Sequence, residues 1–158
     1  MQGGAALGGI AAAGGIATHL EPPAPGAWVL SAAELNTVRA VGEIMFPAGV
    51  FPIDGTDPSV IAEVDRIVGD MLDSLRARAF RYVLRTLEYG TIATRGSRFS
   101  KLDLEHRRAV LAVWADPEVL VRRVSWDSLR VILAMAFFVQ PEVCTAMEWR
   151  ALCGGGAS

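Results

Sequence analysis

Apolar residues recur every three or four positions along most of the chain, which is the spacing of amphipathic α-helices. No run alternates with a period of two between turns, so the sequence predicts no β-sheet. We therefore expect an all-α fold, a small bundle of five to six helices with connections rich in Pro and Gly. The expected helices span residues 31–46, 57–72, 74–87, 100–114, 117–139 and 141–152.

Local signals at the helix ends support these boundaries. Ser31 and Glu34 have the spacing of a capping box, in which each side chain satisfies a backbone amide of the other residue. Asp57-Pro58 and Asp116-Pro117 each combine a capping carboxylate with a proline in the first helical position. A loop is expected from Gly90 to Ser100, where glycine and polar residues gather.

The most apolar part of the chain is Trp126 to Val139. From Val131 to Val139 no side chain carries a charge or a hydrogen-bonding group. This run is far shorter than the roughly 20 residues that a helix needs to cross a bilayer, so no transmembrane span is expected. A helix that is apolar on all sides must be covered on all sides, either by the chain's own core or by a partner.

The two ends differ in composition from the middle. Residues 1–27 read as a Gly/Ala-rich tail followed by a Pro-rich linker, residues 28–152 as the helical domain and residues 153–158 as a flexible tail. The stretch 1–18 resembles the middle region of a twin-arginine export signal, although the two arginines are not in it. Three alternatives stay open: a start placed too late, export with another chain, and an ordinary disordered tail.

Charge and hydropathy raise the question of a partner protein. The chain has 158 residues, a net charge of -2, 52% hydrophobic residues and a mean hydropathy of +0.35. Nothing overall indicates nucleic-acid binding, but acidic residues predominate in 21–75 and basic residues in 76–108. Arg78, Arg81 and Arg85 are expected to share one exposed helix face. That basic face either contacts a phosphate or nucleic acid or is simply solvated, and solvation is favoured because no aromatic residues are interleaved for stacking.

Candidate catalytic groups are few. His106 is expected on an outer face, and it directly follows Glu105, so the two cannot form the Glu-x-x-His pair of a di-iron bundle. No nucleophile elbow, phosphate loop or dinucleotide fingerprint is present. We expect no metal and no cofactor in this chain, and no enzyme activity of the chain alone. Cys144 and Cys153 either form a disulfide after export or remain reduced.

Large aromatic residues near the C-terminal end are the candidates for a partner interface. Trp126 is the first residue of the most apolar stretch and Trp149 lies near the C-terminal end, and core packing is the alternative for both. The interface hypothesis comprises Trp126, Phe137, Phe138 and Trp149.

Three motifs in order resemble the gluconate 2-dehydrogenase subunit 3 family. The first is LSAAELNTVRAVGEIMFPAG, Leu30 to Gly49, a helix that ends in an aromatic residue and proline. The second is IDGTDPSVIAEVDRIVGDML, Ile53 to Leu72, and the third is LAMAFFVQPEVCTAM, Leu133 to Met147, with its aromatic pair and Pro-Glu-Val step. Their order and spacing carry the resemblance, which extends from about Leu30 to Trp149.

This resemblance implies a non-catalytic accessory subunit. Such a subunit binds and stabilises a large FAD-dependent dehydrogenase of the glucose-methanol-choline type, assists its export, and works beside a cytochrome c subunit. The implied location is the periplasm, as an exported and membrane-associated or soluble complex, with the cytoplasm left open. Two other classes stay open: a helical adaptor or regulator unrelated to redox chemistry, and an enzyme whose site the motifs do not reveal.

Overall fold

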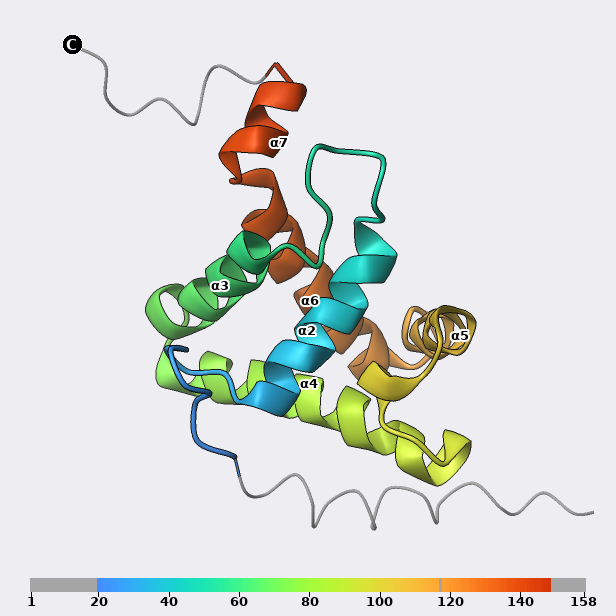
Figure 1. The fold of residues 1–158 in the computed structure, drawn as a ribbon. Coiled ribbons are helices and arrows are strands. Elements are labelled where there is room, and N and C mark those ends of the chain that lie inside the picture. The colour runs from blue at the N-terminus through green and yellow to red at the C-terminus, as the bar shows by residue number, and fades with distance from the viewer. Residues whose placement is uncertain (1–19, 117, 149–158) are drawn as a thin grey trace, which may run out of the picture.

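The computed structural model describes residues 20–116 and 118–148, and within these residues it contains helices and no strand (Figure 1). The predicted all-α fold is confirmed. The α-helices are α2 (Ala32–Met45), α3 (Pro58–Arg66), α4 (Ser74–Arg95), α5 (Leu104–Trp114), α6 (Leu120–Phe138) and α7 (Pro141–Ala146). A π-helical turn, η1 (Ile67–Met71), extends α3, and a 3-10 turn, η2 (Phe99–Lys101), precedes α5.

Helix α2 lies at the centre of the fold and packs against α3, α4, α5 and α6 (Figure 1). Its predicted capping box is confirmed: the amide of Ser31 donates to Glu34 Oε2 at 2.7 Å, and the amide of Glu34 donates to Ser31 Oγ at 3.3 Å. The core that surrounds α2 draws on every helix, and its largest fully buried apolar side chains are Phe99, Phe137, Leu30, Leu84, Leu87, Leu129 and Leu133.

The predicted break between the second and third helices is confirmed. After η1 the backbone of Leu72 is extended, and Asp73 accepts from the amide of Arg76 to cap α4. The predicted loop from Gly90 is wrong, because α4 runs through Gly90 to Arg95 and is capped by Gly96, whose φ of 71° is left-handed. A single glycine lowers helix propensity by about 1 kcal/mol, which the tertiary packing of a long helix overrides.

The later helices begin and end at other residues than the sequence suggests. Asp103, rather than Ser100, caps α5 by accepting from the amide of His106 at 2.9 Å. Helix α6 begins only at Leu120, without a side-chain cap, while Asp116 accepts from the amide of Glu118. Helix α7 begins at Pro141 as predicted and ends at Ala146. Residues 149–152 of the predicted last helix lie outside the described residues.

The predicted exposed basic face on α4 is wrong for two of its three arginines. Arg78 is exposed, but Arg81 and Arg85 are buried. Arg81 forms an ion pair with the buried capping residue Glu34, with Nε 3.0 Å from Oε2. Two turns further along α4, buried Glu88 accepts from the hydroxyls of Thr37 and Ser100. The helix spacing is right, but the interior supplies partners for these charges, and a sequence motif does not show this.

The described part of the Pro-rich linker is fastened to α4, although folded structure was expected only after it. The carbonyl oxygen of Glu21 accepts from Arg81 at 2.5 Å, and its carboxylate accepts from the hydroxyl of Tyr89 at 3.2 Å and pairs with Arg85 at 3.4 Å. Burial, together with the negative charge of Glu21, raises the pKa of the Tyr89 phenol. Glu21 of the linker therefore packs against the helical domain through these contacts.

Candidate functional site

Four phenylalanines gather where the end of α2, the following loop and the end of α6 meet. The rings of Phe46 and Phe137 stack with centroids 4.0 Å apart, and Phe51 and Phe138 meet them edge-on. Phe137 is fully buried, so its assignment to a partner interface is wrong. It faces inward because it continues the buried row that contains Leu133, one turn earlier. Phe138 is half-buried.

The remaining predicted site residues are Trp126 and Trp149 of the interface and the cysteines of the possible disulfide, Cys144 and Cys153. Trp126 is half-buried against the core, with the guanidinium of Arg130 6.0 Å from its ring. Trp149 and Cys153 lie outside the described residues. Cys144 is buried in α7, with its Sγ 3.2 Å from the carbonyl oxygen of Phe138. The predicted disulfide to Cys153 and the role of Trp149 therefore stay predictions.

A loop of residues 47–57 turns back onto α2 and carries Phe51 to the phenylalanine cluster. The amide of Gly55 donates to the carbonyl of Phe46 at 2.9 Å. Gly42 and Gly55 make a close backbone contact, because a Cβ placed on Gly42 would lie only 2.1 Å from the carbonyl oxygen of Gly55. Both positions thus exclude a side chain, and this fixes the loop on the helix.

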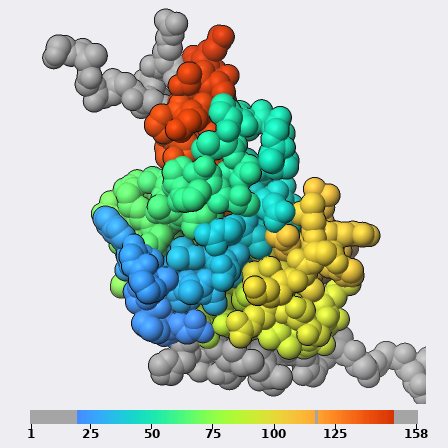
Figure 2. Space-filling view, viewed as in Figure 1, coloured from blue at the N-terminus to red at the C-terminus, as the bar shows by residue number. Residues whose placement is uncertain are grey.

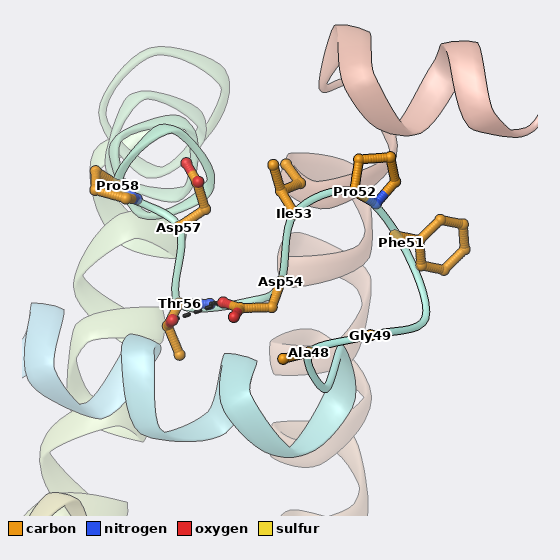
Figure 3. Close-up of a pocket in the computed structure, with 9 residues that line it drawn as sticks. All are labelled: Ala48, Gly49, Phe51, Pro52, Ile53, Asp54, Thr56, Asp57 and Pro58. Atoms are coloured by element: carbon orange, nitrogen blue, oxygen red, sulfur yellow. Dashed lines mark hydrogen bonds between the residues drawn. The ribbon is translucent and has the colours of Figure 1, made fainter.

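The loop lines an open hollow of about 320 Å³ (Figure 3). Its two carboxylates are already engaged: Asp54 accepts from the amide and hydroxyl of Thr56 at 2.7 and 2.6 Å, and Asp57 accepts from both groups of Ser59. The hydrogen bond from the Thr56 hydroxyl is the main cause that lowers the pKa of Asp54. These acids therefore stabilise a turn and cap α3.

A second hollow of about 430 Å³ opens on the other side of Pro52, towards α7. Its wall consists of Pro52, Pro141, Glu142, Thr145 and Ala146. The loop and α7 project together at one end of the molecule, as Figures 1 and 2 show. Glu142 and Thr145 are exposed, and the Thr145 hydroxyl donates to the carbonyl of Pro141 at 2.7 Å. This end of the molecule therefore presents a surface of mostly short side chains.

The described residues contain no group of three or more His, Cys, Asp or Glu side chains that is arranged to hold a metal ion. His106 is exposed, as predicted, and its ring lies 2.7 Å from Asp103 in the first turn of α5. The hydrogen bond from the His106 amide is the main cause that lowers the pKa of Asp103. This pair belongs to a helix cap.

Exposed apolar side chains are concentrated on α6. Half of the large apolar residues that are exposed in the described part of the chain lie between Val119 and Val139. Within the apolar run, Val131 and Val139 are 56% and 52% exposed, although the inner face of the same helix supplies fully buried Leu133 and Phe137. The apolar run that we expected to be covered on all sides is therefore covered by its own chain on one side only.

The exposed outer face of α6 is not part of the interface that the sequence predicts. The interface hypothesis selected aromatic residues, whereas the exposed residues of α6 are mainly valines, leucine and methionine. Their spacing of three and four was available in the sequence as the second face of a doubly apolar helix. In the described part of the chain, no helix combines the length and apolar character needed to cross a membrane.

The fold and its exposed surface define a small all-α protein with one helix that is apolar on both faces. A family model for gluconate 2-dehydrogenase subunit 3 matches residues 32–155, which is most of the chain. The chain therefore belongs to the gluconate 2-dehydrogenase subunit 3 family. Neither the curated protein sequences nor the solved structures gave a match.

Proposed function

We propose that this chain is a non-catalytic accessory subunit that binds and stabilises a larger FAD-containing dehydrogenase subunit of the glucose-methanol-choline type. The single observation that carries the proposal is the match to a dehydrogenase subunit family over residues 32–155. By its name, that family supplies one subunit of a multi-subunit dehydrogenase. A protein with this role needs a surface for its partner more than it needs a reaction centre.

Two properties of the structure support the proposal. The outer face of α6 presents large apolar side chains to solvent, and contiguous patches of this kind on soluble proteins commonly mark interaction sites. In addition, the carboxylates at the hollow beneath the loop are engaged in a turn and a cap, through Thr56 and Ser59. We assign the flavin, and with it the oxidation of the substrate, to the larger subunit.

The test is to tag the C-terminus, purify the full-length chain from its native host, and record the visible spectrum and the masses of co-purifying proteins. The expected result is a yellow complex that contains one polypeptide of flavoprotein size, with a cytochrome c as a further component. A colourless, monodisperse and helical single chain would contradict the proposal. A stable partner without flavin would favour an adaptor unrelated to redox chemistry.

Export of the complex to the periplasm, in soluble or membrane-associated form, is the second part of the proposal. Its support is the likeness of residues 1–18 to the middle region of a twin-arginine signal. Fractionation of the native host should place the tagged chain and the flavoprotein together outside the cytoplasm. Recovery of both proteins in the cytoplasmic fraction alone would contradict this part and leave the binding role intact.

A further inference from the structure

The outer surface of α6 carries one continuous row of side chains, which we call the α6 stripe: Val121, Val124, Ser128, Val131, Met135 and Val139. Successive members are three or four residues apart, so they lie above one another along one face of the helix. The five apolar members are between 40% and 77% exposed. The next row around the helix turns inward, where Ile132 and Ala136 are buried.

The one polar member of the α6 stripe does not interrupt its apolar character. The hydroxyl of Ser128 donates to the carbonyl oxygen of Val124 at 2.8 Å, four residues earlier in the same helix. Its hydrogen-bonding capacity is therefore directed to the helix backbone. A partner that covers this serine does not need to provide a polar group for it.

A charged row borders the α6 stripe on its other side. Arg123, Asp127 and Arg130 each precede a stripe residue by one position, and both arginines lie near Asp127, at 3.9 and 3.7 Å. With Arg122 included, α6 carries three basic side chains and one acidic side chain, which is a net charge of 3 − 1 = +2. The edge of the stripe is thus basic in a chain whose total charge is -2.

The size of the α6 stripe limits what can cover it. With a rise of 1.5 Å per residue, the stripe is about 27 Å long and has an area on the order of 300 Å². A stable interface buries roughly 800 Å² on each partner. Two copies of this chain that pair their stripes therefore fall far below that size. A groove in a larger protein encloses the helix and also reaches the surface beside it.

We propose that the α6 stripe docks into an apolar groove of the larger dehydrogenase subunit, and that acidic side chains on the rim of this groove face Arg123 and Arg130. This inference rests on the function proposed above. It identifies the docking surface of this chain and the kind of groove that binds it. The mode is that of an amphipathic helix in a groove, with anchors at intervals of three, four and seven residues. The inner face of α6 meanwhile stays in the core of its own chain.

The test uses the complex that co-purifies with the tagged full-length chain. Val131→Asp places a charge in the centre of the stripe and should raise the dissociation constant for the flavoprotein at least 30-fold or so, since an unpaired charge in an apolar groove is strongly disfavoured. Leu75→Asp is the matched control on α4, because Leu75 is also an exposed apolar helix residue, at 76%. It should change the constant less than about threefold.

Circular dichroism of each isolated chain establishes that the variant is folded before binding is compared. If folded Val131→Asp retains the flavoprotein as tightly as the unchanged chain, the α6 stripe is not the docking surface. If instead the unchanged chain brings no flavoprotein, the accessory function itself fails. Sedimentation of the isolated chain tests whether a second copy of the chain covers the stripe. A dimer that dissociates in the Val131→Asp variant would overturn the proposal in favour of self-association.

The acidic rim has its own test. Arg123→Glu together with Arg130→Glu should weaken binding on the order of tenfold at low salt and flatten its dependence on ionic strength. Arg76→Glu together with Arg78→Glu is the matched control, since both are exposed arginines on α4. Equal binding of the double variant and the unchanged chain at all salt concentrations would overturn the acidic rim, while the apolar groove is judged by Val131→Asp.

Discussion

The two longest helices of the described residues, α4 and α6, bury residues of the kind that their compositions would place on the surface, and expose residues of the kind that would be expected inside. Helix α4 contains six charged residues in its 22 positions, yet it buries Arg81, Arg85 and Glu88. Helix α6 has the more apolar sequence over its 19 positions, yet it exposes Val121, Val124 and Val131. Helix α4 therefore places charged side chains in the interior, whereas α6 places apolar side chains on the surface.

The difference lies in what each helix finds opposite it. The buried charges of α4 meet complementary groups from α2 and from the segment around Glu21, so each of them has a partner within the chain. No described element of this chain covers the outer face of α6, although its inner face packs against α2, α3, α4 and α5. An interior made of paired charges is complete by itself, whereas an exposed apolar stripe gains free energy from a partner.

The largest effect is expected from breaking the buried pair on α4. Arg81→Met leaves the Glu34 carboxylate buried without its guanidinium, and loss of one partner from a buried ion pair costs about 3–5 kcal/mol. The free energy of unfolding in urea, followed by circular dichroism, should fall by that amount.

The double variant Arg81→Met with Glu34→Gln is the control for this first prediction. Glutamine still offers an oxygen to the amide of Ser31 but carries no charge, so the double variant should recover at least 1 kcal/mol or so of the loss. Equal destabilisation by the single and double variants would mean that Arg81 acts through packing and its hydrogen bond to the Glu21 carbonyl, and not through its ion pair with Glu34.

These residues also show how far the sequence could be interpreted. The capping box at Ser31 and Glu34, the cap at Asp57 and the break before Asp73 depend on neighbours within a few positions, and all three are confirmed. The burial of Arg81 depends on a residue 47 positions away, and local periodicity carries no information about it. Periodicity groups residues on a face, but the packing partners decide whether that face is inside.

The same limit explains the mixed outcome at the candidate site. Phe137 and Phe138 were assigned together because aromatic residues are frequent in interfaces, but adjacent positions on a helix point about 100° apart. Consequently Phe137 belongs to the buried row of Leu133, while Phe138 lies beside Val139 at the edge of the core. The valines of the α6 stripe have no distinctive side chain, so their importance depends on exposure, which only the structure provides.

The second prediction compares the two faces of α6 directly. Leu133→Ala removes a side chain that is 1% exposed and should lower the free energy of unfolding by about 2–5 kcal/mol. Val131→Ala, two residues earlier and 56% exposed, should change it by no more than about 0.5 kcal/mol. Similar losses from both substitutions in the isolated chain would show that the α6 stripe is already covered, and the comparison between α4 and α6 would no longer hold.

A third, smaller effect concerns the backbone contact between Gly42 and Gly55, which holds the loop of residues 47–57 against α2. Gly42→Ala brings a methyl group to 2.1 Å from the carbonyl oxygen of Gly55 and should destabilise the chain by about 1–3 kcal/mol. Gly90→Ala is the counterpart on α4, where nothing lies within 4 Å of the added carbon, and it should stabilise the chain by about 0.5–1 kcal/mol. Thermal unfolding of both variants measures these changes in stability. An unchanged stability of Gly42→Ala would indicate that the loop can move away from α2.

The smallest effect on stability should come from Asp127, the exposed counterpart of buried Glu34. Asp127 lies between Arg123 and Arg130 but is 51% exposed, and such surface pairs contribute about 0–1 kcal/mol. Asp127→Asn should therefore leave the unfolding curve of the isolated chain almost unchanged. In the complex the same substitution leaves the basic edge of α6 uncompensated, so it should strengthen binding to an acidic rim at low salt and lose this advantage at high salt. Asp70→Asn is the matched control on η1, because Asp70 is also an exposed acid in an ion pair, 3.2 Å from Arg66. If both substitutions act equally, the charge of the whole chain matters and its position on α6 does not.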